Sequence, residues 1–341
     1  MGHLLTHHGF SAMKRDKSGR APLHYAAGRF FRCLPLADNR YSCIQLLLGA
    51  NADVNAVDER GRTALQYIAI HEAGYRFMPD HFHPESPIQL LLQRGANPNI
   101  CDVQGETALH CASRCGWVDK QTLQILVKHG DLNVSNENGE TCLHVLMNNE
   151  MPDNDVLKML LDGGANPNAQ DVKGRTPLHL LVEKSRFFRN PVQTANTLLK
   201  YRLNVNAHDN EGKTPLHILA RATGPLCNHR QFPKGAASVG HNILELLLSY
   251  GADVRAQDLK GSTPYELIVK NDRIASRTSH LVTVVSSQGS GETITVSTSK
   301  KAPIRPYDST PHPWEGGEQS NYRNGIWSVP AVVLPSTAAR M

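Results

Sequence analysis

The segment DVKGRTPLHLLV, residues 171–182, contains the signals for one complete structural element. Asp171 favours a turn because its carboxylate can bond backbone N–H groups nearby, and Gly174 supplies a positive φ at no steric cost. Thr176 is a helix N-cap, and Pro177 suits the first helical turn, where its missing N–H costs nothing. We therefore expect a tight turn that leads directly into an apolar helix.

This phrase occurs seven times with fixed internal spacing. The copies begin near residues 16, 58, 102, 136, 171, 209 and 258. Leucine-rich segments with a polar hinge separate the copies, so each unit is predicted to be a turn, a helix, a loop and a second helix. One such helix pair buries too little apolar surface alone and is stable only when stacked on its neighbours. The sequence therefore predicts an all-α solenoid with short β-hairpin turns over residues 16–272.

The repeated phrase closely resembles the ankyrin repeat family. The resemblance rests on Thr-Pro-Leu-His at 176–179 and 214–217 and on hinges such as GADV and GANPN, and it covers roughly residues 4–272. It implies that the turns form β-hairpin fingers, that the first helices line a concave face, and that one histidine per repeat bonds within and between repeats as scaffold. These histidines are His24, His110, His144, His179 and His217. Gln66 and Glu266 replace the histidine in two copies, where looser junctions are expected.

The chain begins inside such a unit. LLTHHGFSAMKRDKSG at 4–19 aligns with LLLSYGADVRAQDLKG at 246–261, with leucines, glycines and aspartates in register. Residues 1–15 are therefore expected to be the second helix of a repeat whose first helix is absent. Two explanations stay open. Met1 is an alternative or mistaken start, which would make this a shortened product of a longer array, or the segment is an abbreviated terminal cap.

The spacing of the repeats is irregular. Successive turn glycines lie 34 to 49 residues apart, whereas the standard repeat is about 33 residues long. The extra residues fall between the two helices of a unit, at 28–41, 71–87, 185–192 and 221–241. Insertions on one face of a solenoid often form its binding face. These insertions are rich in aromatic residues. They form either a second contact surface or small satellite clusters in which the aromatic side chains pack beneath their own loops.

Composition places the chain among soluble folded proteins. Of its 341 residues, 40% are hydrophobic and 20% are charged. No apolar run approaches the roughly 20 residues that span a bilayer, and the N-terminus lacks the pattern of a secretory signal. The seven cysteines form no disulfide framework, which favours a reducing compartment, the cytoplasm or the nucleus.

The net charge of +5 is unevenly distributed. From residue 270 onward there are eight Lys/Arg and five Asp/Glu, so this tail carries +3. The remaining 28 cations and 26 anions leave +2 for the rest of the chain. Because the repeats are nearly neutral, they lack the electrostatic footprint of a nucleic-acid-binding protein.

No catalytic motif is found, and the chain is not predicted to be an enzyme or to need a cofactor. HFH at 81–83 and LHCASRC at 109–115 contain ligand-type side chains. Neither segment supplies a complete four-ligand set, so no metal site is expected. Gly2 lies in a pattern that N-myristoylation requires, although the same stretch is already explained as helix.

The predicted function is protein recognition by a non-catalytic scaffold that uses its finger tips and concave face. A rigid surface loses little conformational entropy when it binds. The tips are expected to be basic at 60–62, acidic at 106–140 and basic again at 173–213, so the partner should carry the complementary order. The candidate contact residues are Arg60, Arg62, Gln104, Glu106, Asn138, Glu140, Lys173, Arg175, Asn210, Lys213 and Lys260.

The resemblance also implies a modification. Hinge asparagines of this family are often β-hydroxylated by an asparaginyl hydroxylase, which would tune stability. The corresponding positions in this chain are Asn55, Asn99, Asn168 and Asn206.

Residues 273–341 form a tail of different character. Segment 280–299 alternates Val, Ile and Thr around a Gly-rich turn, which allows a weak β-hairpin, and the Pro-, Gly- and Ser-rich remainder reads as disordered. Two further hypotheses follow. The chain could be an adaptor whose tail recruits an effector such as a ubiquitin ligase, or it could be the regulatory repeat region of a larger enzyme.

Overall fold

The structure is a computed structural model. It describes residues 11–28, 39–71, 86–114, 120–149, 152–185, 187–188, 190–222, 236–269, 282–286 and 292–296. Contacts divide the chain into two units, residues 1–189 and 190–341, and each is described by itself. Gly2, residues 1–10 of the segment expected to be a second-helix remnant, the HFH segment and most of the insertions and tail lie outside the described residues. Residues 11–15, the described part of that remnant, are not helical.

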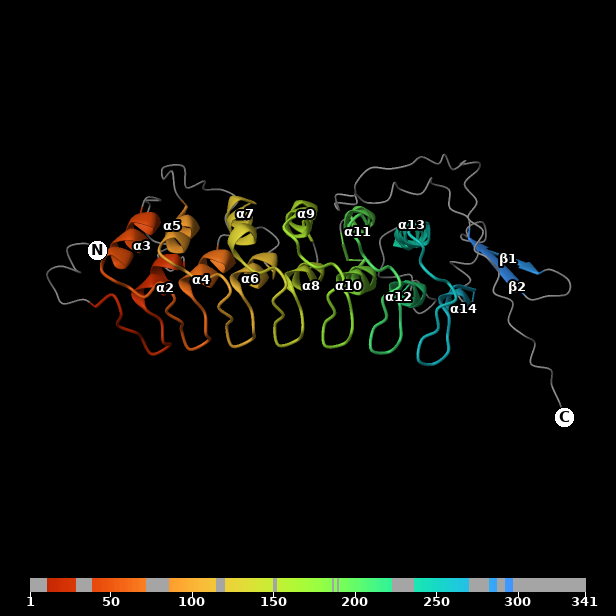
Figure 1. The fold of residues 1–341 in the computed structure, drawn as a ribbon, viewed down its shortest axis with the longest axis horizontal. Helices are drawn as coiled ribbons and strands as arrows, with labels where there is room; N and C mark the ends of the chain where they lie inside the picture. Colours follow the sequence, from red (N-terminus) through yellow and green to blue (C-terminus); the bar gives the residue numbers. More distant parts are fainter. Residues whose placement is uncertain are drawn as a thin grey trace, which may run out of the picture. The chain divides into compact units, whose positions relative to one another are not determined.

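Unit 1 is built from helices in two layers. Its described helices are α2 (Pro22–Ala27), α3 (Asn39–Gly49), α4 (Ala64–His71), α5 (Pro87–Gln93), α6 (Ala108–Arg114), α7 (Lys120–His129), α8 (Cys142–Met147), α9 (Asn154–Asp162) and α10 (Pro177–Lys184). The even-numbered helices pack side by side as an inner layer, and the odd-numbered helices α3 to α9 pack beside one another as an outer layer (Figure 1). Loops project beneath the inner layer and lead into each inner helix (Figure 1).

Helix α10 shows why the repeated phrase forms an inner helix. Thr176 has extended backbone angles and ends the loop, and Pro177 occupies the first turn. Residues 178–182 are apolar except for His179, and Leu178 and Leu181 are fully buried. Burying one such leucine contributes about 1.5–3 kcal/mol. The helix is short and gains its stability from packing, as on α8, rather than from its own length.

The core of unit 1 lies between its two layers. Leucines from inner helices, such as Leu109 and Leu143, are buried with Leu91, Leu126 and Leu160 from outer helices. Each repeat thus supplies one leucine-rich face from each of its two helices. This is the stacking that the repeated sequence predicts, and the all-α solenoid is confirmed.

Unit 2 contains the same helix pairs and a short sheet. Its elements are α11 (Pro191–Leu199), α12 (Pro215–Ala222), α13 (Ala236–Ser249), α14 (Pro264–Val269), β1 (Val282–Ser286) and β2 (Glu292–Val296). Helix α11 packs on α13, and α12 packs on α13 and α14. The two strands pair antiparallel, with Val282 opposite Val296 and Val284 opposite Ile294. They lie inside the segment for which the sequence allows a hairpin.

Candidate partner-binding surface

Each inner helix is preceded by a closed loop, here called a finger. In the finger that begins at Asp102, carboxylate Oδ1 accepts the backbone N–H groups of Gln104 and Glu106, both at 2.9 Å. The backbone N–H of Asp102 donates to the carbonyl of Glu106 at 3.0 Å, which closes the loop. One aspartate therefore satisfies the donors of its own finger and holds the tip in a fixed shape.

The finger glycine is required for two reasons. Gly139 has φ +71°, and a Cβ there would lie 2.7 Å from the backbone nitrogen of Val172 in the next finger. The left-handed backbone favours glycine, and the close approach leaves no space for a side chain. The motif glycine thus sets both the turn and the distance between successive fingers.

Backbone hydrogen bonds join neighbouring fingers of unit 1. The residue after each turn Asp or Asn donates its N–H to a carbonyl of the preceding finger. The pairs are Glu59 to Ser18 at 3.1 Å, Val103 to Arg60 at 2.9 Å, Glu137 to Gln104 at 3.1 Å and Val172 to Asn138 at 3.0 Å. The tips are consequently held in a fixed register, and their outward side chains form a preorganised row.

The motif histidines bridge repeats. Nδ1 of His144 accepts the N–H of Thr141 at 3.2 Å, so Nε2 carries the proton and donates to the carbonyl of Arg175 at 2.9 Å. His24 and His110 make the same bridges to Arg62 and Glu140, both at 2.9 Å, and His217 of unit 2 bonds Ser262 at 3.0 Å. Nδ1 of His179 accepts the N–H of Thr176 at 3.1 Å. Burial lowers the pKa of His110, His144 and His217, which favours the neutral ring that these bonds require.

Gln66 reproduces the histidine bridge. Its Oε1 accepts the N–H of Thr63 at 2.8 Å, and its Nε2 donates to the carbonyl of Glu106 in the next finger. The expectation of a looser junction at Gln66 is therefore wrong, because an amide offers one acceptor and one donor in the same arrangement as neutral imidazole. Glu266, in contrast, accepts the N–H of Thr263 at 3.4 Å and acts as a local cap.

Hinge asparagines form a second line of bridges. Oδ1 of Asn55 accepts the N–H of Asn97 at 2.8 Å, and its Nδ2 donates to the carbonyl of Gly95 at 3.1 Å. Asn99 bonds the N–H of Asp131 at 2.7 Å. Asn206 bonds the N–H of Asp253 at 2.8 Å, and the N–H of Asn168 donates to Asn166 at 2.9 Å.

Asn133 also belongs to this line, although it is not among the asparagines predicted from the sequence. Its Oδ1 accepts the N–H of Asn166 at 2.8 Å, and its Nδ2 donates to the carbonyl of Gly164 at 3.4 Å. Asn133 lies in the hinge GDLNV at 130–134, which differs from the GANPN hinges that hold Asn99 and Asn168. Its position three residues before the turn Asn136 is the signal that could have found it.

The structure divides the predicted contact residues of unit 1 into two groups. Arg60, Gln104, Asn138 and Lys173 are exposed at the tips, as are Asn210 and Lys260 in unit 2. Two apolar side chains stand in the same row, since Val103 and Val172 are 59% and 60% exposed. The second group lies at the residue after each finger glycine, here called the finger base, and its side chains already pair with other side chains of the chain. Its members in unit 1 are Arg62, Glu106, Glu140 and Arg175.

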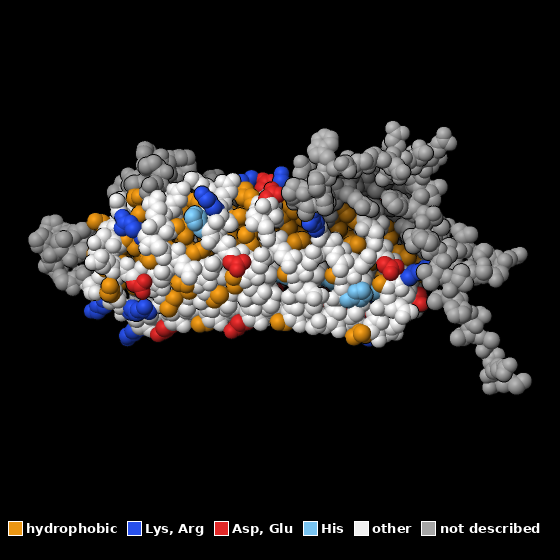
Figure 2. All heavy atoms as spheres, viewed as in Figure 1, with side chains coloured by type: hydrophobic (Ala, Val, Ile, Leu, Met, Phe, Trp, Pro, Cys, Tyr) orange, Lys and Arg blue, Asp and Glu red, His pale blue; other side chains and the backbone are white. Residues whose placement is uncertain are grey.

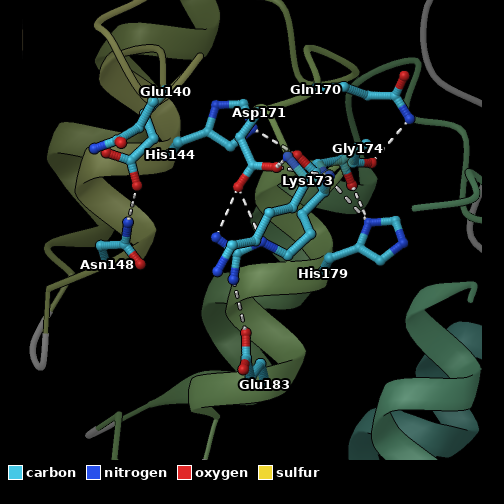
Figure 3. Close-up of polar contacts among 12 residues, drawn as sticks. Glu140, His144, Asn148, Gln170, Asp171, Lys173, Gly174, His179 and Glu183 are labelled. Atoms are coloured by element: carbon cyan, nitrogen blue, oxygen red, sulfur yellow. Dashed lines mark hydrogen bonds and ion pairs between the residues drawn. The ribbon is translucent and has the colours of Figure 1, made fainter. Parts of the chain in front are cut away.

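The prediction that the finger tips at 106–140 are acidic is wrong at Glu106. It is 4% exposed, and its carboxylate pairs with Arg114 at the end of α6. Glu140 is half-buried and accepts from Asn148 at 2.6 Å and Asn136 at 3.1 Å (Figure 3). Glu106 is therefore not accessible to a partner.

The basic residues at the finger bases are also paired. The guanidinium of Arg175 lies 2.7 Å from Asp171 and 3.3 Å from Glu183 (Figure 3). Burial opposes ionisation of Asp171, but hydrogen bonds from Arg175 and the backbone hold the pKa of that carboxyl below its ordinary value. Arg62 lies 3.4 Å from Asp102, and Lys213 of unit 2 pairs with Glu211. Among the described residues of unit 1, the tip cations Arg60 and Lys173 make no ion pair of this kind.

The described ranges can be compared with the requirements of a metal site, a reactive thiol and a membrane span. They contain no group of three or more His, Cys, Asp or Glu side chains that could hold a metal ion. Burial raises the pKa of Cys142 to about 12, which makes this thiol a poor nucleophile. No helix within those ranges has the length and hydropathy to cross a membrane.

Family models of the ankyrin repeat match most of the repeat region. A model of three ankyrin repeats matches residues 81–171 and 146–229, and a single-repeat model matches 18–59 and 211–259. An ankyrin repeat protein of Acanthamoeba polyphaga mimivirus is 37% identical over 82 residues, which is 24% of this chain and 14% of that protein. Inversin of Canis lupus familiaris is 34% identical over 169 residues, 49% of this chain and 13% of inversin.

The fold has a counterpart among solved structures. The crystal structure of the ankyrin repeat domain of Bcl-3 superposes with a TM-score of 0.53 at 24% identity, covering 74% of this chain and 95% of that domain. The match concerns fold alone, and this chain spans about a seventh of the length of the mimivirus protein and of inversin. With fingers, bridging histidines and paired helices in register, this chain belongs to the ankyrin repeat family.

Proposed function

We propose that this chain is a non-catalytic scaffold that captures another protein with its finger tips and the neighbouring concave face. Ankyrin repeats are a general protein–protein interaction module. The observation that carries the proposal is the row of exposed side chains at Arg60, Gln104, Asn138 and Lys173. These side chains project from loops that are hydrogen-bonded to one another, while their neighbours at the finger bases are paired internally.

Base and tip residues of a finger differ in their contacts, and this difference supports the proposed mechanism. Base residues such as Arg175 tie the finger to its helix, whereas tip residues such as Lys173 make no ion pair with any described residue. Binding would therefore order only a few side chains, since the backbone is already fixed. A preorganised surface retains more of its gross contact energy as affinity.

Proximity labelling followed by affinity capture tests the proposal. The tip variant combines Gln104→Ala, Asn138→Ala and Lys173→Glu. Its matched control combines Gln121→Ala, Gln124→Ala and Lys128→Glu, which are exposed on the outer helix α7. We expect the tip variant to lose the partners that the wild type and control both retain. Equal capture by the two variants would contradict recognition through the fingers.

A further inference from the structure

We infer that the first two fingers of unit 1 bind an acidic segment of the partner protein. This inference rests on the proposed function and adds the chemical class of the partner. The surface, here called the basic edge, consists of four exposed cations: Lys14, Arg15, Lys17 and Arg60. Lys17 lies on the first finger, which begins at Asp16, and Lys14 and Arg15 directly precede that finger. None of these three is among the predicted contact residues, although they form the run KRDK interrupted only by Asp16.

The two fingers form one continuous surface. The N–H of Glu59 donates to the carbonyl of Ser18 at 3.1 Å, and a Cβ on Gly19 would lie 2.8 Å from that same nitrogen. The guanidinium of Arg15 donates to the carbonyl of Val57 in the second finger. Lys17 and Arg60 therefore lie on fingers that are joined to each other, and Figure 2 shows Lys and Arg side chains, with Asp and Glu side chains among them, at the loop edge below α2.

Cations outnumber carboxylates at this edge. Segments 14–20 and 58–62 contain six Lys or Arg and three Asp or Glu side chains. Two of the carboxylates already hold their own fingers. Asp16 accepts the N–H groups of Ser18 and Arg20 at 2.8 and 2.9 Å and the hydroxyl of Tyr25.

Asp58 is arranged in the same way. It accepts the N–H groups of Arg60 and Arg62 at 2.8 and 2.9 Å and the Tyr67 hydroxyl at 2.8 Å, and it is buried. Glu59 is the remaining carboxylate. The outward-facing field of the two fingers is consequently positive.

The cations of the basic edge are available to a partner. Lys14, Lys17 and Arg60 make no ion pair with any residue that the structure describes. This distinguishes Arg60 from Arg62, which lies 3.4 Å from Asp102 at the base of the same row. Lys17 and Arg60 on adjacent tips, together with Lys14 and Arg15 directly before the first finger, are complementary to a short run of Asp or Glu.

The neighbouring fingers favour an acidic peptide over nucleic acid. The third finger presents Val103 and Gln104, and the fourth presents Glu137, so the positive field ends after the second finger. A nucleic-acid strand carries phosphates continuously along its length and would meet that carboxylate. A peptide can end its acidic run at Arg60 and place an apolar side chain against Val103, which is 59% exposed.

Fluorescence anisotropy of a labelled Glu-rich peptide with a terminal leucine tests the inference on the full chain. The edge variant combines Lys17→Glu and Arg60→Glu. The control combines Lys128→Glu and Lys158→Glu, which change the net charge equally on the outer helices α7 and α9. We expect the edge variant to bind about tenfold more weakly than wild type, the control to match wild type, and added salt to weaken binding. A Gln-rich peptide of equal length should not bind.

Three outcomes would overturn the inference. The first is that the wild type does not bind the Glu-rich peptide. The second is that the edge and control variants lose peptide affinity equally. The third is that the basic edge binds single-stranded DNA more tightly than the peptide. The last result would assign the edge to nucleic acid. If the peptide fails while the Gln104, Asn138 and Lys173 variant still loses its cellular partners, only the partner class is wrong and recognition through the fingers stands.

Discussion

The junctions at His144 and Gln66 perform the same structural task with different chemistry. His144 accepts the N–H of its own N-cap residue, Thr141, at 3.2 Å, and Gln66 accepts that of Thr63 at 2.8 Å. Each side chain then donates to a carbonyl of the next finger. The comparison shows that a repeat junction needs an acceptor and a donor at a fixed separation rather than an imidazole ring. Only the imidazole, however, changes its charge near neutral pH.

The largest effect is expected when either bridge is deleted. His144→Ala and Gln66→Ala should each lower the free energy of unfolding by about 2–4 kcal/mol, because both leave a cavity and an unpaired carbonyl. Both side chains are fully buried, so the two losses should be similar. Urea denaturation at pH 7.5 provides the measurement. A much smaller loss at Gln66 would show that the ring itself strengthens the junction.

Acidification should lower the stability of the histidine junctions but not that of the Gln66 junction. Burial lowers the folded-state pKa of His110 and His144 below the unfolded value of about 6.5, so the unfolded chain binds more protons as pH falls. The stabilisation is complete above pH 6.5 and is lost below it. Lowering the pH from 7.5 to 5.5 should cost about 1–2 kcal/mol of unfolding free energy in the wild type.

The double substitution His110→Gln and His144→Gln sharpens this test. It should retain most of the stability at pH 7.5, because Gln66 shows that an amide can form the bridge. It should also flatten the acid response of unfolding measured by circular dichroism. An unchanged response would mean that other groups titrate on unfolding.

The hinge bridge of Asn133 should contribute less to the free energy of unfolding than the histidine bridge of His144. Asn133→Ala removes two hydrogen bonds from an exposed side chain, so we expect a loss of about 1 kcal/mol in unfolding free energy. Water can replace the lost partners there, whereas it cannot at His144. Thermal denaturation of Asn133→Ala and His144→Ala in parallel compares the two bridges. An equal loss of stability in both variants would contradict the role of burial.

The smallest expected effect is the reverse exchange, Gln66→His. At pH 7.5 it should change the unfolding free energy by less than about 1 kcal/mol, since the neutral ring supplies the same donor and acceptor. The variant should lose more stability than wild type on acidification. Parallel urea titrations at pH 7.5 and 5.5 check both statements.

The repeat itself could be read from the sequence because its signals are local. Asp102, Gly105 and Thr107 act on backbone groups within a few residues, so the turn and the helix start are contained in one phrase. The candidate surface was only partly predictable. Glu106 and Glu140 occupy the same motif position as Arg62, and nothing in the phrase indicates which of them is exposed. Their burial depends on Arg114 and Asn148, each eight residues further on and brought back by the inner helix.

Sequence alone therefore determined the solenoid and its repeat, because turns, caps and apolar periodicity are short-range properties of the chain. Tertiary structure decided which side chains remain free. Lys17 and Arg60 lie on adjacent tips only because Ser18 and Glu59 are hydrogen-bonded across a separation of 41 residues. Contacts across such distances depend on how the repeats stack, and stacking cannot be read from any single repeat.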